Sequence, residues 1–168
     1  PHAHARIVSL DTSAALAMEG VETVLTGPEL VADGIGNIIC GWGITSKDGN
    51  PMNMGAWSAL ATEKVRYVGD AVAIVVADSK AQAKLASEAV VVTYEELPVV
   101  VGSVEALAPS APKIHDNAPG NLIFDWEIGD LAPTDAALAS AAHVTEMEIT
   151  NNRLAPNPLE PRSAIATF

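Results

Sequence analysis

The chain has 168 residues and a formal net charge of −12, from 9 basic and 21 acidic side chains. Nucleic-acid binding depends on Lys and Arg neutralising phosphates, so this balance, without any basic run, argues against a nucleic acid or an anionic membrane as partner. Apolar residues make up 49% of the chain and aromatic residues only 4%, so a core must rest on Ala, Val, Leu and Ile.

The cysteine content and the ends of the chain bear on its origin. Cys40 is the single cysteine, which excludes an intrachain disulfide, and without basic neighbours it is expected to be a buried, inert thiol. No apolar run approaches the roughly 20 residues of a membrane span, and no signal peptide is visible. We expect a cytoplasmic protein. Because the chain starts at Pro1 and stops in an apolar run at Phe168, we interpret it as a piece of a longer protein.

The first part of the chain predicts two strands around a short helix. Alternating apolar residues indicate a strand at His4–Leu10. Asp11 or Thr12 can cap a helix at Ser13–Met18, because their side-chain oxygens accept free backbone N–H groups. The β-rich run Val21–Thr26 predicts the next strand.

Glycine and asparagine dominate the next stretch, Gly34–Ser58, which therefore predicts a long loop with a short strand at Ile38–Cys40. Four large apolar side chains lie on it: Trp42, Met52, Met54 and Trp57. They either fold back onto the core or form a docking surface.

A strand–helix–strand unit near Val65–Val101 is the clearest feature of the sequence. Val65–Val68 predicts a strand, Gly69-Asp70 a turn, and the apolar run Ala71–Ala77 a strand buried on both faces. Asp78 is expected to cap the helix that follows.

That helix, Ser79–Ala89, has Ala81, Leu85 and Ala89 on one face, and Val90–Tyr94 follows it as another strand. Such a unit forms a right-handed crossover if its strands pair in parallel. The predicted fold class is α+β, with a mixed sheet containing this crossover and the beginning of a second α/β domain.

Weaker patterns follow. Glu95–Pro98 interrupts the strand, Val99–Val101 resumes it, and Ser103–Leu107 predicts a short helix. Three prolines in Ala108–Gly120 indicate a surface linker. The remaining predicted elements are strands at Leu122–Ile128, His143–Thr150 and Arg162–Phe168, and a helix at Thr134–Ala141.

Few residues in the sequence suggest a catalytic, cofactor-binding or metal-binding role. His2 and His4 share a strand face, but two histidines are too few for an ordinary metal site. Glu95 and Glu96 point to opposite faces of an extended chain, which argues against a general acid/base pair. The pairs Gly34-x-Gly36 and Gly41-x-Gly43 lack the third glycine and the strand–helix context of a dinucleotide site.

Glu160-Pro161-Arg162 follows a proline-rich loop. The two charged residues either form a local salt bridge at the entrance of a strand or form one wall of a pocket that other residues complete.

Several motifs together resemble a known family. Pro1–Ile7 (PHAHARI), Val65–Ala73 (VRYVGDAVA), Val92–Val99 (VTYEELPV) and Pro158–Arg162 (PLEPR) occur in order along nearly the whole chain. They resemble the large subunits of molybdenum hydroxylases, the family of xanthine dehydrogenase, aldehyde oxidase and aerobic carbon monoxide dehydrogenase. Trp126–Asp130 resembles the carbon monoxide dehydrogenase branch of the family more than the other branches. Leu159 occupies a position where methionine is more usual in the family.

The resemblance implies an α/β hammerhead domain at residues 1–107, a linker at 108–121 and the truncated start of a molybdenum-cofactor-binding domain at 122–168. Its structural signature would comprise Gly69, Asp70, Tyr94, Pro98, Glu160, Pro161 and Arg162. The implied parent is an oxidoreductase that uses molybdopterin and water-derived oxygen, with iron–sulfur clusters and FAD on partner domains or subunits. The family's cofactor loops and catalytic glutamate are expected beyond Phe168, so no catalytic, cofactor or metal residue is assigned here.

Two hypotheses follow. In the first, the chain is an inactive fragment of such a large subunit, a scaffold that contacts the rest of that subunit and the iron–sulfur and flavin subunits. In the second, it is a free-standing interaction module that docks a partner through the Trp42–Trp57 loop.

Overall fold

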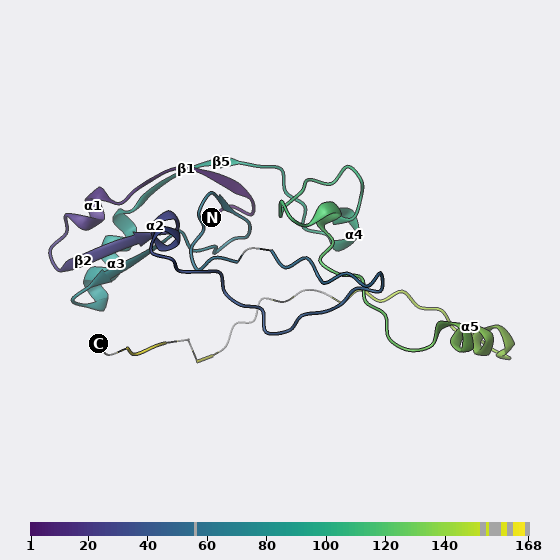
Figure 1. Ribbon diagram of the computed structural model, residues 1–168. Helices are drawn as coiled ribbons and strands as arrows, with labels where there is room; N and C mark the ends of the chain where they lie inside the picture. Colours follow the sequence, from purple (N-terminus) through teal and green to yellow (C-terminus); the bar gives the residue numbers. More distant parts are fainter. Residues whose placement is uncertain (56, 152–153, 155–158, 161–162, 167–168) are drawn as a thin grey trace. The chain divides into compact units, whose positions relative to one another are not determined.

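Two small antiparallel sheets organise the first part of the molecule (Figure 1). The computed structural model describes residues 1–55, 57–151, 154, 159–160 and 163–166. The chain divides into two compact units, Pro1–Glu127 and Ile128–Phe168.

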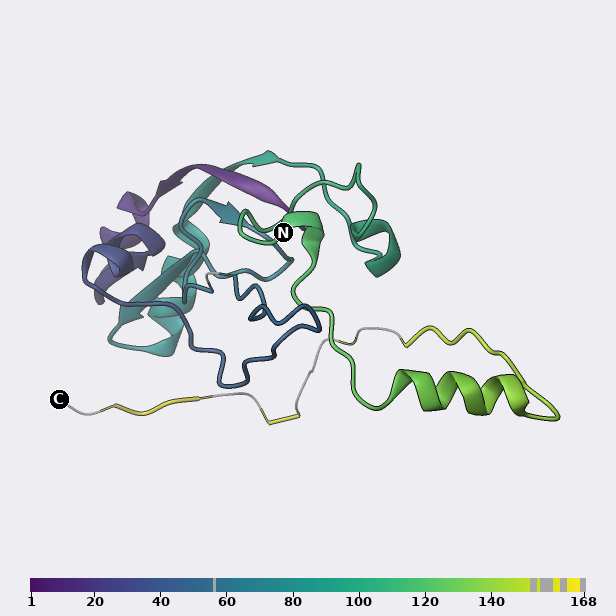
Figure 2. The same ribbon diagram turned by 45° about the vertical axis from the view of Figure 1, so that its right-hand side comes forward.

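The first sheet has the strand order β3-β1-β5. β1 (Ala5–Asp11) is central and pairs antiparallel with both β3 (Lys64–Val65) and β5 (Val91–Glu96). Ala5 lies opposite Val65 on one side and Glu96 on the other. The long pairing of β1 with β5 is visible in purple and teal in Figure 2.

The second sheet consists of β2 (Val21–Thr26) and β4 (Ala73–Ala77), again antiparallel. α1 (Ser13–Leu16) and α3 (Lys80–Ala89) pack against it. Ala15 of α1, Val24 of β2 and Ala86 of α3 form the buried cluster, and both alanines are fully buried. Small side chains let the helices approach the sheet closely, as the low aromatic content predicts.

The predicted α+β class and the strand–helix–strand order β4–α3–β5 are confirmed, but the strands form two antiparallel sheets rather than a mixed sheet. β4 pairs with β2, and β5 pairs with β1, so the two strands that flank α3 belong to different sheets. Every ladder among the described residues is antiparallel. An apolar run in the sequence predicts that a strand forms there. It does not predict which strand it pairs with, because that depends on residues far away in the sequence.

The expectation that the strand before the helix is buried on both faces is also wrong. Ile74 and Val76 of β4 are 43% and 44% exposed, whereas Ala73 and Val75 pack against the Ala15–Val24–Ala86 cluster. The helices therefore cover one face of this sheet.

The packed face and the cap of α3 also differ from the prediction. Its cap is Ser79, whose hydroxyl accepts a hydrogen bond from the Gln82 amide at 3.3 Å, rather than Asp78. Ala86 is buried, but Leu85 is 57% exposed. The central residue of the expected apolar face therefore points towards solvent.

The sequence-based prediction missed α2 (Gly27–Ala32). The Thr26 amide donates to the Glu29 carboxylate at 2.7 Å as part of a capping box, and Pro28 stands in the first turn. Both are recognised signals for the start of a helix. Gly27 is buried, and a Cβ at this position would overlap the carbonyl of Ala61, so α2 packs closely on the segment that leads into β3.

Four segments that were predicted as strands form no strand: Ile38–Cys40, Val99–Val101, Leu122–Ile128 and His143–Thr150. The remaining described elements are α4 (Ser103–Ala106), the 3-10 turn η1 (Pro119–Asn121) and α5 (Leu131–Ser140), which begins before the predicted Thr134. In the second unit, Val144 on one face of the predicted strand and Met147 and Ile149 on the other are all more than 60% exposed. The predicted strand Arg162–Phe168 lies partly outside the described residues, and 163–166 form no strand.

Candidate functional site

The signature motifs near the two ends of the 65–98 region meet at one polar site, called here the signature junction: His4, Arg66, Asp70, Tyr94, Pro98 and His115. His4 precedes β1, and its Nδ1 lies 2.8 Å from the carbonyl oxygen of Pro98. The Leu97 amide donates to the His4 carbonyl at 3.0 Å. Both the backbone and the side chain of His4, which is 7% exposed, therefore hold the segment that follows β5.

The predicted Gly69-Asp70 turn is confirmed, and hydrogen bonds within the turn stabilise it. Gly69 has a φ of +96°, and the Asp70 amide donates to the Tyr67 carbonyl at 3.2 Å. The Asp70 carboxylate accepts a hydrogen bond from the Arg66 amide at 3.0 Å. Burial, and then the nearby Asp70 charge, raise the pKa of both Tyr67 and Tyr94.

Gly69→Val is expected to lower the free energy of unfolding by about 1–3 kcal/mol, because a β-branched residue is strained at positive φ. No heavy atom lies within 4 Å of the added Cβ, so the loss comes from backbone conformation alone. Gly36→Val is the matched control, since Gly36 has equally open surroundings without a positive φ. Equal melting temperatures for the two variants would contradict this account.

Residues 113–121, within the predicted linker and its end, pack beside β3. Arg66 Nε donates to the Ile114 carbonyl at 3.2 Å, and Lys64 Nζ lies 3.3 Å from the Asp116 carboxylate. Hydrogen bonding to Lys64 lowers the pKa of Asp116, whereas burial and then Arg66 lower the pKa of His115. Asn121, at a φ of +56°, donates to the carbonyls of Ala106 and Pro112, both at 3.0 Å.

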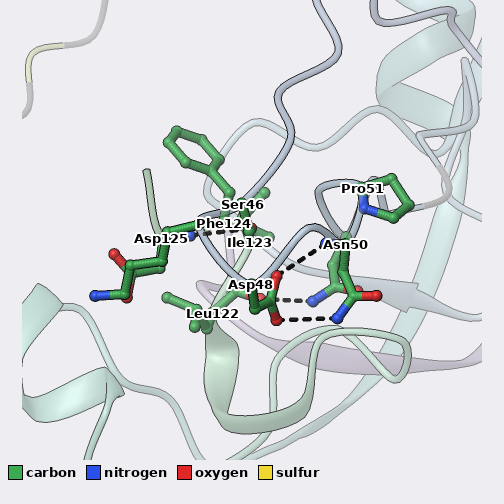
Figure 3. A pocket seen from close by; sticks show the side chains of 10 residues that line it. Ser46, Asp48, Asn50, Pro51, Leu122, Ile123, Phe124 and Asp125 are labelled. Atoms are coloured by element: carbon green, nitrogen blue, oxygen red, sulfur yellow. Dashed lines mark hydrogen bonds and ion pairs between the residues drawn. The ribbon is translucent and has the colours of Figure 1, made fainter. Parts of the chain in front are cut away.

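A second polar cluster, called here the clasp, joins residues 44–53 to residues 122–125 (Figure 3). The Lys47 amide donates to the Asp125 carbonyl at 2.7 Å, and the Asn53 amide to the Ile123 carbonyl at 2.8 Å. Lys47 Nζ also lies 2.8 Å from the Asp125 carboxylate. The side chains around this pocket include no nucleophile paired with a base, so the cluster ties two chain segments together.

The long loop carrying the clasp exposes part of its apolar content. Trp42 and Trp57 are 79% and 60% exposed, while Met52 is half-buried and its sulfur lies 3.3 Å from the Ile44 amide nitrogen. Cys40 is exposed, which corrects the expectation of a buried thiol, and its Sγ donates to the Trp42 carbonyl at 3.3 Å. A loop that is only partly folded back leaves this thiol at the surface.

Of the seven predicted signature residues, Gly69 and Asp70 form the turn, Tyr94 lies within reach of the Asp70 charge, and Pro98 binds His4. Glu160 is exposed, and Pro161 and Arg162 lie outside the described residues, so the two interpretations of that motif stay predictions. Sequence reasoning missed Arg66, His115 and Asn121 as members of these contacts. Arg66 lies inside a signature motif, but only the folded chain shows which side chains meet there.

His2 and Arg6 form separate ion pairs with the two glutamates at the end of β5. His2 Nδ1 lies 3.2 Å from the Glu96 carboxylate, and Arg6 Nε lies 3.2 Å from that of Glu95. Among the described residues no group of three or more His, Cys, Asp or Glu side chains could hold a metal ion. Within the same residues, no helix has the length and apolarity needed to cross a membrane.

Two family models and several known proteins match this chain. A family model described as "Aldehyde oxidase and xanthine dehydrogenase, a/b hammerhead domain" matches residues 1–98, and one described as "Molybdopterin cofactor-binding domain" matches residues 114–168. The carbon monoxide dehydrogenase large chain of Hydrogenophaga pseudoflava is 38% identical, over 100% of this chain and 21% of its own length. The aldehyde oxidoreductase of Megalodesulfovibrio gigas is also 38% identical, over 97% of this chain and 17% of its own length.

Solved structures give the same result. Carbon monoxide dehydrogenase from Oligotropha carboxidovorans matches with a TM-score of 0.65 and 36% identity, over 84% of this chain and 18% of that chain. Quinoline 2-oxidoreductase from Pseudomonas putida 86 matches with a TM-score of 0.66 and 36% identity, over 85% and 17% of the two chains. This chain thus spans about a fifth of the curated relatives' length. The resemblance seen in the motifs is confirmed: the chain belongs to the aldehyde oxidase and xanthine dehydrogenase family and contains its a/b hammerhead domain.

Proposed function

We propose that this chain is the scaffold part of the large subunit of a molybdenum hydroxylase of the carbon monoxide dehydrogenase kind. The observation that carries the proposal is the match of the whole chain to only 21% of a carbon monoxide dehydrogenase large chain. The described polar groups support a scaffold role. In the signature junction and in the clasp, the polar side chains bind mainly to other groups of the same chain. Oxidation of carbon monoxide or a related small molecule would belong to the complete parent.

The implied molybdopterin does not fit the described residues of this chain. α5 has no buried residue, and the described side chains from Ile128 onwards are exposed, so they form no cradle for a cofactor. The buried polar atom without a partner among the described residues is His4 Nε2, which lies outside the 114–168 match. We assign molybdopterin to other parts of the parent, with iron–sulfur clusters and FAD on partner domains or subunits.

The proposed domain organisation follows the motifs: a hammerhead domain at 1–107, a linker at 108–121 and the start of the cofactor-binding domain at 122–168. The proposed partners are the remainder of the large subunit and the iron–sulfur and flavin subunits. We propose the cytoplasm as the compartment, on the basis of the single cysteine.

A second candidate function is a free-standing interaction module that uses the Trp42–Trp57 loop. The exposure of Trp42 and Trp57 supports it. Similarity to the large subunits along the whole chain favours the scaffold instead.

Complementation tests the proposed scaffold. The chain is co-expressed with the large chain of the Hydrogenophaga relative from which the matching 21% has been removed, together with that enzyme's other subunits. We expect the chain to copurify with the shortened large chain and to restore carbon monoxide oxidation. A folded chain that fails to copurify would contradict the proposal.

A separate preparation tests the expected inactivity of the chain. Expressed alone, the chain is expected to contain no molybdenum, iron or flavin and to oxidise no substrate. Stoichiometric molybdenum in elemental analysis would overturn that expectation. A Trp42→Ala/Trp57→Ala double variant that lost copurification while keeping its fold would assign assembly to the loop.

A further inference from the structure

Three large apolar side chains from separate stretches of the first unit meet at its surface. The Ile38 amide donates to the Trp57 carbonyl at 2.7 Å, which holds these two residues side by side. The Trp57 ring centroid lies 6.4 Å from that of Tyr67, a residue of the motif that begins at β3. All three residues are between 46% and 60% exposed, and together they are called here the apolar ridge. Ile39 and Trp42, which follow Ile38 in the chain, are 90% and 79% exposed.

The loop that supplies most of the ridge is almost without charge. Residues 34–62 contain only two charged side chains, Lys47 and Asp48, in a chain whose net charge is −12. Lys47 Nζ lies 2.8 Å from the Asp125 carboxylate, and Asp48 accepts hydrogen bonds from the backbone and side-chain nitrogens of Asn50, both at 3.0 Å. Both charges are therefore engaged within the chain. An exposed patch that is aromatic and poor in charge has the composition of the buried centre of a permanent interface.

Charge also bears on what covers the ridge. Two copies of a chain with a net charge of −12 repel each other, which disfavours self-association. A separate subunit is commonly guided to its site by complementary charges, but the charged neighbours of Tyr67 are already bound to groups of this chain: Arg66 to the Ile114 carbonyl and Asp70 to the Arg66 amide. A segment of the same polypeptide needs no such guidance, because its tether gives it a high effective concentration.

We propose that the apolar ridge is covered by an uncharged, apolar surface of the remaining part of the large subunit. The inference rests on the proposed scaffold function, in which this chain is about a fifth of a large subunit. The ridge is then an internal contact of the complete subunit, made as that subunit folds, and not a docking site for a separate protein.

Copurification with the shortened Hydrogenophaga large chain and its other subunits tests the ridge through Ile38→Glu and Trp57→Glu. Each variant is expected to lower the copurified amount about tenfold or more, because a carboxylate at either position would be buried without a partner. Circular dichroism of each isolated variant first checks that it folds, and if one does not fold the other carries the test. If neither folds, the ridge belongs to the core of the isolated chain and the proposal is overturned.

Leu85→Glu is the matched control, because Leu85 is 57% exposed and lies on α3, outside the ridge. It should copurify as well as the unsubstituted chain, and an equal loss for Leu85→Glu would overturn the proposal. If the unsubstituted chain does not copurify, the scaffold function itself fails, and this inference fails with it. If both ridge variants copurify as well as the unsubstituted chain, the scaffold function stands and only the ridge proposal is overturned.

The same experiment distinguishes the other occupants of the ridge. If a ridge variant keeps the shortened large chain but loses one of the other subunits, the ridge belongs to that partner subunit. If light scattering shows that the isolated chain is a dimer and that Ile38→Glu makes it a monomer, a second copy covers the ridge. Either result would overturn the proposal.

Discussion

Replacing Leu60 with alanine is expected to lower the free energy of unfolding of the first unit by about 2–5 kcal/mol. Leu60 is 2% exposed and is the largest side chain that is almost fully buried among the described residues. Its truncation removes apolar contacts and leaves a cavity that the surrounding backbone fills only in part. Urea unfolding followed by tryptophan fluorescence measures the loss as a lower midpoint at an unchanged slope.

Leu107→Ala is the matched control, because Leu107 is 57% exposed. Its midpoint should lie close to that of the parent chain, since exposed substitutions of this kind change stability by about 0.5 kcal/mol or less. If both variants unfold at the same urea concentration, Leu60 does not occupy the core position described above.

Gly27→Ala is expected to cost about 1–3 kcal/mol, because an added methyl group would overpack a rigid contact. Its Cβ would overlap the Ala61 carbonyl oxygen and would lie 2.8 Å from the Ala61 carbonyl carbon and 3.1 Å from the Leu60 carbonyl oxygen. All three are backbone atoms, so no flexible side chain can move aside. The Ala61 amide is in turn bonded to the Ala71 carbonyl at 2.7 Å, which limits how far this segment can shift.

A thermal melt of Gly27→Ala beside Gly41→Ala measures this contact. Gly41 has no heavy atom within 4 Å of an added Cβ and no positive φ, so its substitution tests only the loss of glycine's flexibility. We expect a lower melting temperature for Gly27→Ala alone. Equal melting temperatures would show that α2 can move away from Ala61 at little cost.

Local elements were predictable where the residue pattern was strong. The β-branched run Val21–Thr26 and the turn at Gly69-Asp70 are present as expected, and the predicted helix after Ala77 begins within one residue of its expected start. Strand pairing was not predictable, because the paired residues of β1 and β5, from Asp11–Val91 to Ala5–Glu96, lie at least 80 positions apart in the sequence. The alternation at His143–Thr150 forms no strand because the described residues offer that segment no pairing partner.

The candidate site was predictable only as separate motifs. Tyr94 and Pro98 belong to a motif that was evident in the sequence, but the contact between Pro98 and His4 spans 94 positions. His115 lies in a proline-rich stretch whose composition indicates a linker, and Asn121 organises that stretch through three hydrogen bonds. Such roles depend on tertiary packing, which local composition does not encode.

Two of the three ladders among the described residues are nested in sequence: β1 with β5 encloses β2 with β4, and residues 34–58 lie inside both. A single backbone cut in that loop would leave two pieces that remain joined by both ladders, so a nicked molecule would stay assembled. The entropy of closing a loop grows only slowly with its length, so longer insertions at this position cost little stability. This loop is therefore the part of the hammerhead where evolution can add sequence without disturbing either sheet.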